Sequence, residues 1–183
     1  MNYGGRSAGS VPFAIASAVV FEGMRAGAGT FRLVLDLPAR ARLGSVAFAE
    51  FCRATDLSTR GVVFYAIYGF GGVLLTLTAW LVTARGRSSP RVHNLLGAAV
   101  LCSIFVLVFT TQAAPLMWRV GSAPPDPLLL AALLDRFTFW TTLRVCCVDL
   151  SFLATVAALV SLVFDQRPGS GSQTDSGSLE SGS

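Results

Sequence analysis

Ionisable side chains interrupt the first and the last of four long apolar stretches in this chain. Such groups are costly in the hydrocarbon core of a bilayer, where insertion scales give a central Arg or Asp about 2.5–3.5 kcal/mol. In membrane helices they face the bundle interior, pair with one another, and mark sites for protons, substrates or lipid headgroups. The residues predicted to form a buried charge network or to line a pocket are Glu22, Arg25, Arg32, Arg144 and Asp149.

The spacing of these residues limits how they can pair. Glu22, Arg25 and Arg32 are separated by multiples of three to four residues, so they share one face of a helix. Arg144 and Asp149 point about 140° apart around a helix and cannot pair closely with each other. We expect Glu22 to pair with Arg25 or with an arginine of another helix. The least costly arrangement crosses the helices: Glu22 against Arg144, and Asp149 against Arg25 or Arg32.

Other residues contribute few candidates for chemistry. His93, the single histidine, opens the third apolar stretch, either as an accessory general base or as a solvated side chain, and Gln112 is a candidate polar lining residue. The four cysteines show no C-x-x-C spacing, so neither a metal site nor a disulfide is expected. The sequence has no phosphate-binding loop, nucleophile elbow or dinucleotide fingerprint, and no cofactor is expected.

The composition is typical of an integral membrane protein. Of 183 residues, 53% are hydrophobic and 13% are charged, against about 25% charged in soluble domains. About 20 apolar residues span a bilayer as a helix. The sequence therefore predicts an all-α bundle of four transmembrane helices, with spans at residues 11–35, 62–84, 93–114 and 139–164.

These spans divide the chain into three parts. Residues 1–10 are a lead-in and residues 11–165 form one transmembrane domain. Residues 166–183 are a Gly/Ser-rich tail that is predicted to be disordered. Pro38 and Pro115 are expected to end the first and third helices. Each long connection is expected to carry an interfacial helix. In the first, Leu43, Val46, Ala47, Phe51 and Ala54 recur at helical spacing, which fits an interfacial helix and, almost as well, an extramembrane helix packed on the bundle. In the second, residues 128–134 are apolar but too short to span, and we expect an interfacial turn of helix that feeds the fourth span.

The net charge of +4 comes from arginines spread along the chain, which argues against nucleic-acid binding. Arginines in the short connection at residues 85–91 favour an orientation with both termini in the cytoplasm, by the positive-inside rule. We therefore expect an integral protein of a bacterial cell membrane, in contact with lipid.

Two stretches carry a resemblance to a known family: FRLVLDLPARARLGSVAFAEFCRATDLSTRGVVFYAIYG, residues 31–69, and LLDRFTFWTTLRVCCVDLSFL, residues 133–153. With the proline at Pro115, they make the chain similar to the anthrone oxygenase-like family of small four-helix membrane proteins. Arg144 matches the family pattern, whereas Phe137 and Thr141 depart from it. The resemblance implies, for its characterised members, oxygenation of polyketide anthrones without a bound metal or flavin.

Three functions are compatible with these features. The first is a protein resembling the anthrone oxygenases, whose charged pocket binds a small apolar or aromatic substrate. The second is a non-enzymatic protein that assembles with a membrane partner through glycines 69, 71 and 72, its buried charges being structural. The third, a transporter or channel subunit, lacks support from an inverted repeat.

Overall fold

The computed structural model describes residues 10–86 and 88–165, and these are almost entirely helical. The elements are α1 (Ser10–Phe31), a π-helical turn η1 (Arg32–Asp36), α2 (Leu37–Leu43), α3 (Ser45–Thr55), α4 (Thr59–Arg85), α5 (Pro90–Ser122) and α6 (Pro127–Asp165). The tail predicted to be disordered and most of the lead-in lie outside the described residues.

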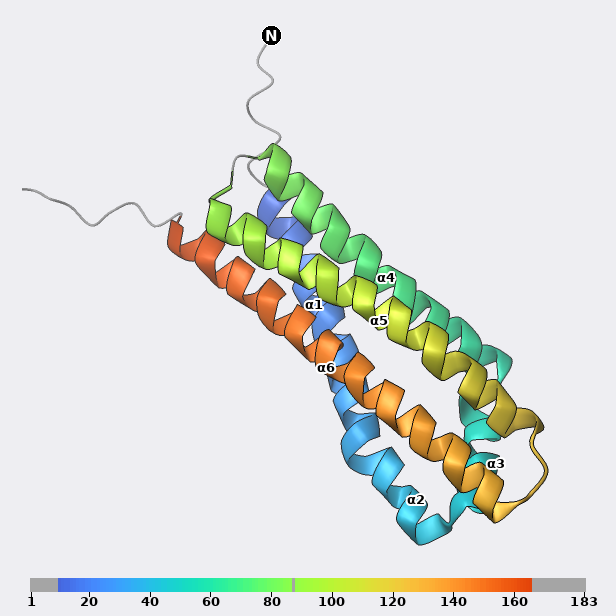
Figure 1. Cartoon of the computed structure of the whole chain (residues 1–183). Helices are drawn as coiled ribbons and strands as arrows, with labels where there is room; N and C mark the ends of the chain where they lie inside the picture. Colours follow the sequence, from blue (N-terminus) through green and yellow to red (C-terminus); the bar gives the residue numbers. More distant parts are fainter. Residues whose placement is uncertain (1–9, 87, 166–183) are drawn as a thin grey trace, which may run out of the picture.

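Four helices form the bundle that the sequence predicts (Figure 1). Each of α1, α4, α5 and α6 packs against the next, and α6 closes the ring against α1. The stretches long and apolar enough to cross a membrane are Ser10–Leu43, Thr59–Arg85, Pro90–Ser122 and Pro127–Asp165. The all-α membrane bundle is therefore confirmed, and the start of α1 lies at the same end of the bundle as the end of α6 (Figure 1).

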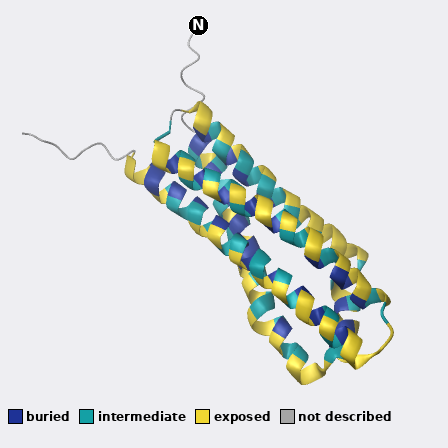
Figure 2. Cartoon of the chain, viewed as in Figure 1, coloured by how far each residue is buried: buried dark blue, intermediate teal, exposed yellow. Residues whose placement is uncertain are grey.

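The outside of the bundle is as apolar as its inside. Large hydrophobic side chains point outward along every long helix, among them Phe13 (75% exposed), Ile67 (63%) and Leu153 (60%). Figure 2 shows exposed residues along the outer faces of all four helices. A soluble protein rarely leaves so much contiguous apolar surface uncovered, so contact with lipid explains this surface.

Inside the bundle, two larger apolar clusters lie on either side of a middle layer, which contains buried polar residues beside a third, small apolar cluster of Ala26, Val106 and Val148. One cluster lies near the chain ends and includes Ile15, Leu96 and Leu162. The other joins α3 to the far halves of α5 and α6, and includes Phe48 and Leu134. The buried polar residues of the middle layer are Glu22, Arg25, Thr76, Ser103 and Ser151.

Pro38 does not end the first helix, contrary to the prediction. Proline removes a backbone donor and disfavours regular helix around it. Here η1 precedes it, with the Leu37 amide bonded to the Arg32 carbonyl, and α2 continues through Pro38 to Leu43. The wider turn lets the helix pass the proline, and π-turns of this kind are frequent at functional sites.

Two further boundaries differ from the prediction. Pro115 lies inside α5, which continues to Ser122, so it does not end the third helix. Residues 128–134, expected to feed the fourth span, form the first turns of α6, so this helix begins well before the predicted start at residue 139. In both places the flanking residues favour helix and pack in the bundle, which outweighs one proline or a short apolar run.

α3 packs against the bundle, which is the second of the two arrangements that the sequence left open. Phe48, Ala49 and Cys52 are buried, whereas Leu43 and Phe51 are exposed. On the same helix, Arg53 donates hydrogen bonds to the carbonyls of Val120, Gly121 and Ala123 at the end of α5. These carbonyls have no partner within their own helix, and Arg53 supplies one.

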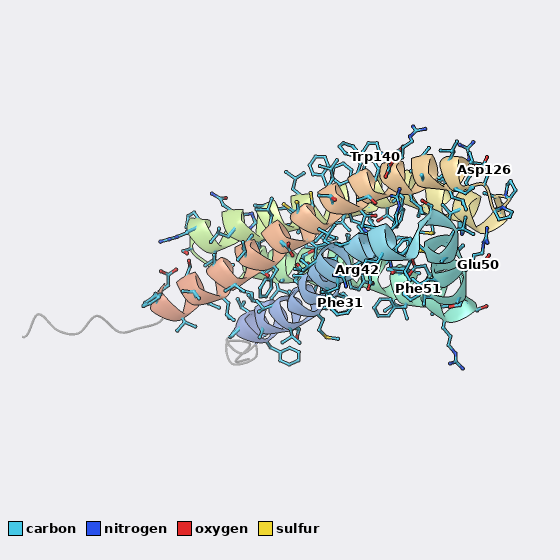
Figure 3. The ribbon with its side chains drawn as sticks, turned by 90° about the horizontal axis from the view of Figure 1, so that it is seen from below. Phe31, Arg42, Glu50, Phe51, Asp126 and Trp140 are labelled. Atoms are coloured by element: carbon cyan, nitrogen blue, oxygen red, sulfur yellow. The ribbon has the colours of Figure 1, made fainter. Side chains whose placement is uncertain are left out.

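Figure 3 shows that Glu50 of α3 and Asp126 of the α5–α6 turn lie at this same end of the molecule. Glu50 forms an ion pair with Arg53, and Asp126 accepts hydrogen bonds from the amides of Leu128 and Leu129 at the start of α6. The acidic group at a helix start also opposes the positive end of the helix dipole. This end of the bundle is thus held by side-chain caps.

Replacing Arg53 by Met should lower the free energy of unfolding in detergent by about 2 kcal/mol, because the α5 carbonyls lose charged donors. The matched control is Arg60→Met, since Arg60 is exposed at the start of α4 and should change stability little. Thermal unfolding of the purified proteins measures both. Equal stability of the two variants would contradict a capping role for Arg53.

Candidate functional site

The five residues predicted to form one charge network lie in three places along the bundle. Glu22 and Arg25 form a closed pair in its middle. Arg32 and Arg144 lie together further along, where both line one pocket. Asp149 lies apart, accepting a long hydrogen bond of 3.5 Å from Thr30 at the α1–α6 contact.

The predicted crossed pairing is therefore wrong. Arg25 Nη1 donates to Glu22 Oε1 at 2.6 Å, one turn away on the same helix, which is the other pairing that the sequence allowed. No ion pair of the described residues joins Asp149 to Arg25 or Arg32. An intrahelical pair needs no particular approach of a second helix, and this explains why it prevails over the crossed one.

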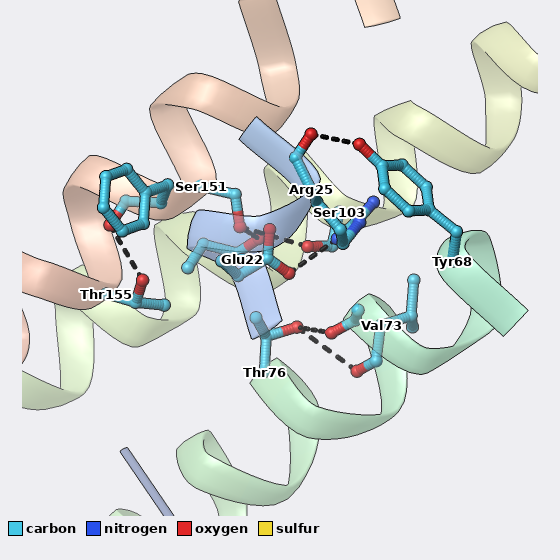
Figure 4. Close-up of polar contacts among 11 residues, drawn as sticks. Glu22, Arg25, Tyr68, Val73, Thr76, Ser103, Ser151 and Thr155 are labelled. Carbon is cyan, nitrogen blue, oxygen red and sulfur yellow. Dashed lines mark hydrogen bonds and ion pairs between the residues drawn. The ribbon is translucent and has the colours of Figure 1, made fainter. Parts of the chain in front are cut away.

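The Glu22–Arg25 pair is fully buried, with neither residue exposed. The Tyr68 hydroxyl donates to the backbone carbonyl of Arg25, and Ser103 and Ser151 lie beside the Glu22 carboxylate, 3.1 Å from each other (Figure 4). Ser151 also lies within hydrogen-bond distance of the Ala99 carbonyl. Polar side chains of α4, α5 and α6 therefore converge on one ion pair of α1 and fix the register of the four helices.

Gly72 makes room for the Arg25 side chain. A Cβ atom at this position would overlap the Arg25 guanidinium group. The neighbouring glycines are used in a similar way: a Cβ at Gly71 would meet Phe21 and one at Gly69 would touch Leu107. The glycine face of α4 thus contacts α1 and α5, and is not the free surface that assembly with a partner through these glycines requires.

The second cluster centres on Asp56, in the turn between α3 and α4. Both oxygens of its carboxylate accept hydrogen bonds from Arg32, a two-point contact of the kind that is strong between guanidinium and carboxylate. The Tyr65 hydroxyl donates to Asp56 at 2.9 Å and accepts from Arg32 at 2.5 Å. The three side chains therefore form a hydrogen-bonded triangle that joins η1, the α3–α4 turn and α4.

Local sequence places Asp56 in this position. Ser58 caps α4 by accepting a hydrogen bond from the Gly61 amide. A Cβ at Gly61 would overlap backbone carbonyls of Thr55 and Asp56, so only glycine lets α4 start this close to the end of α3. The tight turn directs Asp56 back toward Arg32.

Arg144 approaches this triangle from α6. Its guanidinium carbon lies 5.9 Å from the centre of the Tyr65 ring. The guanidinium carbon of Arg32 lies at the same distance from the centre of that ring. Unlike Arg32, Arg144 forms no ion pair or hydrogen bond with any residue that the structure describes. An arginine inside a membrane span without a carboxylate partner is a strong indication of function.

A pocket of about 440 Å³ adjoins these side chains, between α4, α5 and α6. One end is polar, formed by Arg32, Asp56, Tyr65 and Arg144. The remaining walls are mostly apolar and include Phe70, Leu107, Met117, Trp118 and Phe137. Pockets for small organic molecules have this size and this combination of apolar walls with a few polar groups.

The two predicted accessory residues lie elsewhere. Gln112 is exposed and does not line the pocket, although its neighbours Thr110 and Thr111 do, with hydroxyls bonded to their own helix. His93 stacks on Trp80, with ring centres 5.0 Å apart. Since His93 precedes Thr110 by 17 residues on the same helix, it lies roughly 25 Å from the pocket.

Sequence reasoning missed the partners of the arginines. Asp56, Tyr65 and Tyr68 are not among the site residues predicted from the sequence. One signal was available for Asp56, which stands two residues before the serine that caps α4. Nothing local in the sequence marked the two tyrosines as partners of α1.

Cys52 lies beside this cluster without being reactive. It is fully buried on α3. Burial raises the pKa of its thiol to about 12, and the negative charge of Asp56 adds to the effect. Cys52 is therefore a neutral thiol at neutral pH.

In the described part of the chain, no three or more His, Cys, Asp or Glu side chains lie close enough together to hold a metal ion.

No family model, no curated protein and no solved structure matches this chain.

Gly72→Ala should destabilise the protein by about 1–3 kcal/mol, because the added methyl group displaces the buried Arg25 side chain. Gly27→Ala is the matched control, since a Cβ there meets nothing within 4 Å and the change should be neutral or slightly stabilising. Thermal unfolding in detergent compares the two. A Gly72→Ala protein as stable as the Gly27→Ala protein would show that the packing described here is incorrect.

Arg25→Met should cost about 3 kcal/mol of stability, because it leaves Glu22 buried without its counter-charge. The double variant Glu22→Gln/Arg25→Met removes both charges and should be more stable than Arg25→Met alone. Denaturant titration of the wild type, both single variants and the double variant measures the coupling. Additive effects would mean that the two residues do not interact.

Proposed function

We propose that this protein binds a small, largely aromatic molecule in the pocket between α4, α5 and α6. The observation that supports the proposal most directly is the pocket itself, about 440 Å³ in volume, with one polar end and otherwise apolar walls. A molecule that dissolves in the bilayer would find there an environment similar to lipid, together with directional polar contacts.

The form of the pocket wall suggests how such a molecule enters. Val62, Phe70 and Trp118 line the pocket and are also among the exposed large hydrophobic residues of α4 and α5. They belong to the outer surface that faces lipid, so an apolar molecule can reach the pocket from the bilayer, between these two helices. Aromatic side chains at this mouth favour a ligand with flat rings.

The resemblance to the anthrone oxygenase-like family supports an aromatic ligand and extends the proposal to oxygenation of an anthrone. Arg144, the residue that matches the family pattern, is one of the polar residues of the pocket. Oxygen consumption by the purified protein with an anthrone, compared with protein carrying Ala66→Phe in the pocket wall, tests this extension.

The alternative, in which the charges are purely structural, applies well to one of the two clusters. Glu22 and Arg25 are enclosed and line none of the pockets described here. Arg32 and Arg144 differ, because they border a volume large enough for a ligand. We therefore assign a structural role to the first cluster and ligand binding to the second.

Binding of an uncharged aromatic probe, 2-naphthamide, tests the proposal. Ala66→Phe places a ring in the pocket and should weaken probe binding by roughly tenfold. Ala84→Phe, at an exposed position of the same helix away from the pocket, is the control and should bind as the wild type does. Quenching of tryptophan fluorescence in an uncharged detergent measures binding. Equal binding by the two variants would contradict the proposed pocket.

A further inference from the structure

Arg144 stands between two cavities. It lines the large pocket on one side and, with Arg32 and Tyr65, a small cavity of about 80 Å³ on the other. The small cavity lies between α1, α4 and α6, and Asp36 also borders it. The guanidinium group is thus enclosed by protein on several sides while remaining accessible from both cavities.

The acidic groups near Arg144 are already engaged or lie beyond ion-pair distance. Asp56 is bound by Arg32 and Tyr65, and Glu22 by Arg25. Asp149, on α6 itself, accepts from Thr30. Asp36 shares the small cavity, but it does not form an ion pair with Arg144.

The charges that line the large pocket therefore do not balance. Arg32 and Asp56 cancel each other, and Arg144 leaves one positive charge at the polar end. Arg144 is partly buried. Partial burial of a guanidinium group without a counter-charge is unfavourable, and an anion that arrives with the ligand would relieve this cost. The planar group with its several N–H donors suits a carboxylate, which it can bind at two points.

We propose that Arg144 is an anion-binding residue and that the ligand is an aromatic molecule carrying a carboxylate. The carboxylate binds Arg144 at the polar end, next to the Tyr65 ring, and the rings extend along the apolar wall toward Phe70 and Trp118. This inference rests on the proposed function, because it names the class of ligand for the same pocket.

A matched pair of probes tests the inference. The acid 2-naphthoate and the neutral 2-naphthamide have nearly the same shape and differ in charge at neutral pH. The wild type should bind the naphthoate roughly tenfold more tightly than the amide, because only the acid compensates Arg144. This comparison needs no variant, so it stands even if a substitution at Arg144 prevents folding.

Variants then assign the preference to one side chain. Arg144→Gln should bind the two probes about equally, and Arg144→Lys should keep part of the preference for the acid, since charge remains without the planar group. Arg42→Gln removes an arginine that is exposed on α2 and should leave the preference unchanged. Asp36→Asn should strengthen naphthoate binding, because it removes the acidic group that shares the small cavity with Arg144.

The outcomes separate this inference from the proposed function. Amide binding that is lost in Ala66→Phe, with no preference for the acid, would overturn the anion site and keep the aromatic pocket. Binding of neither probe by the wild type would overturn both. A preference for naphthoate that disappears when phosphatidylglycerol is added would assign Arg144 to a lipid phosphate and overturn the carboxylate ligand.

Discussion

Charge inside an apolar bundle has to be compensated within the protein, and this requirement organises the structure. The buried pair of Glu22 and Arg25 lies at the centre, with neither residue exposed. Around it, Tyr68, Ser103 and Ser151 contribute polar atoms from the three other long helices. Each helix must keep its register for these contacts to form together. The apolar clusters on either side cannot impose such precision, because many registers bury similar apolar surface.

Near α3, the partly buried charge is compensated by a residue that lies outside the long helices. Arg32 is compensated by Asp56 from outside the long helices, and the π-turn at Arg32–Asp36 together with the tight α3–α4 turn brings them into contact. Arg144 joins this group without an acidic partner of its own. The central pair is fully buried, whereas the second cluster borders open volume. This difference in accessibility separates structural charges from those available to a ligand.

The fold class followed from the sequence, because long apolar runs admit only helices in a bilayer, and each predicted span lies within one of the four long apolar helices. Helix ends were harder to predict. Pro38 and Pro115 were expected to end two helices. The chain stays helical at both, through a π-turn before Pro38 and through continued packing around Pro115. The sequence also left open which side of α3 is buried, and in the structure Phe48 points inward and Phe51 outward.

For the site, the sequence alone determined that charged residues interrupt the first and last spans, and which residues they are, since burial cost makes such residues conspicuous. Only the tertiary structure decided their partners. Asp56 and Arg32 are 24 residues apart and meet through two turns of the chain, and Tyr65 completes the group from a third element. Pairing depends on helix rotation and approach, which no local pattern specifies. The isolation of Arg144, on which the proposed ligand class depends, is likewise a property of the assembled bundle.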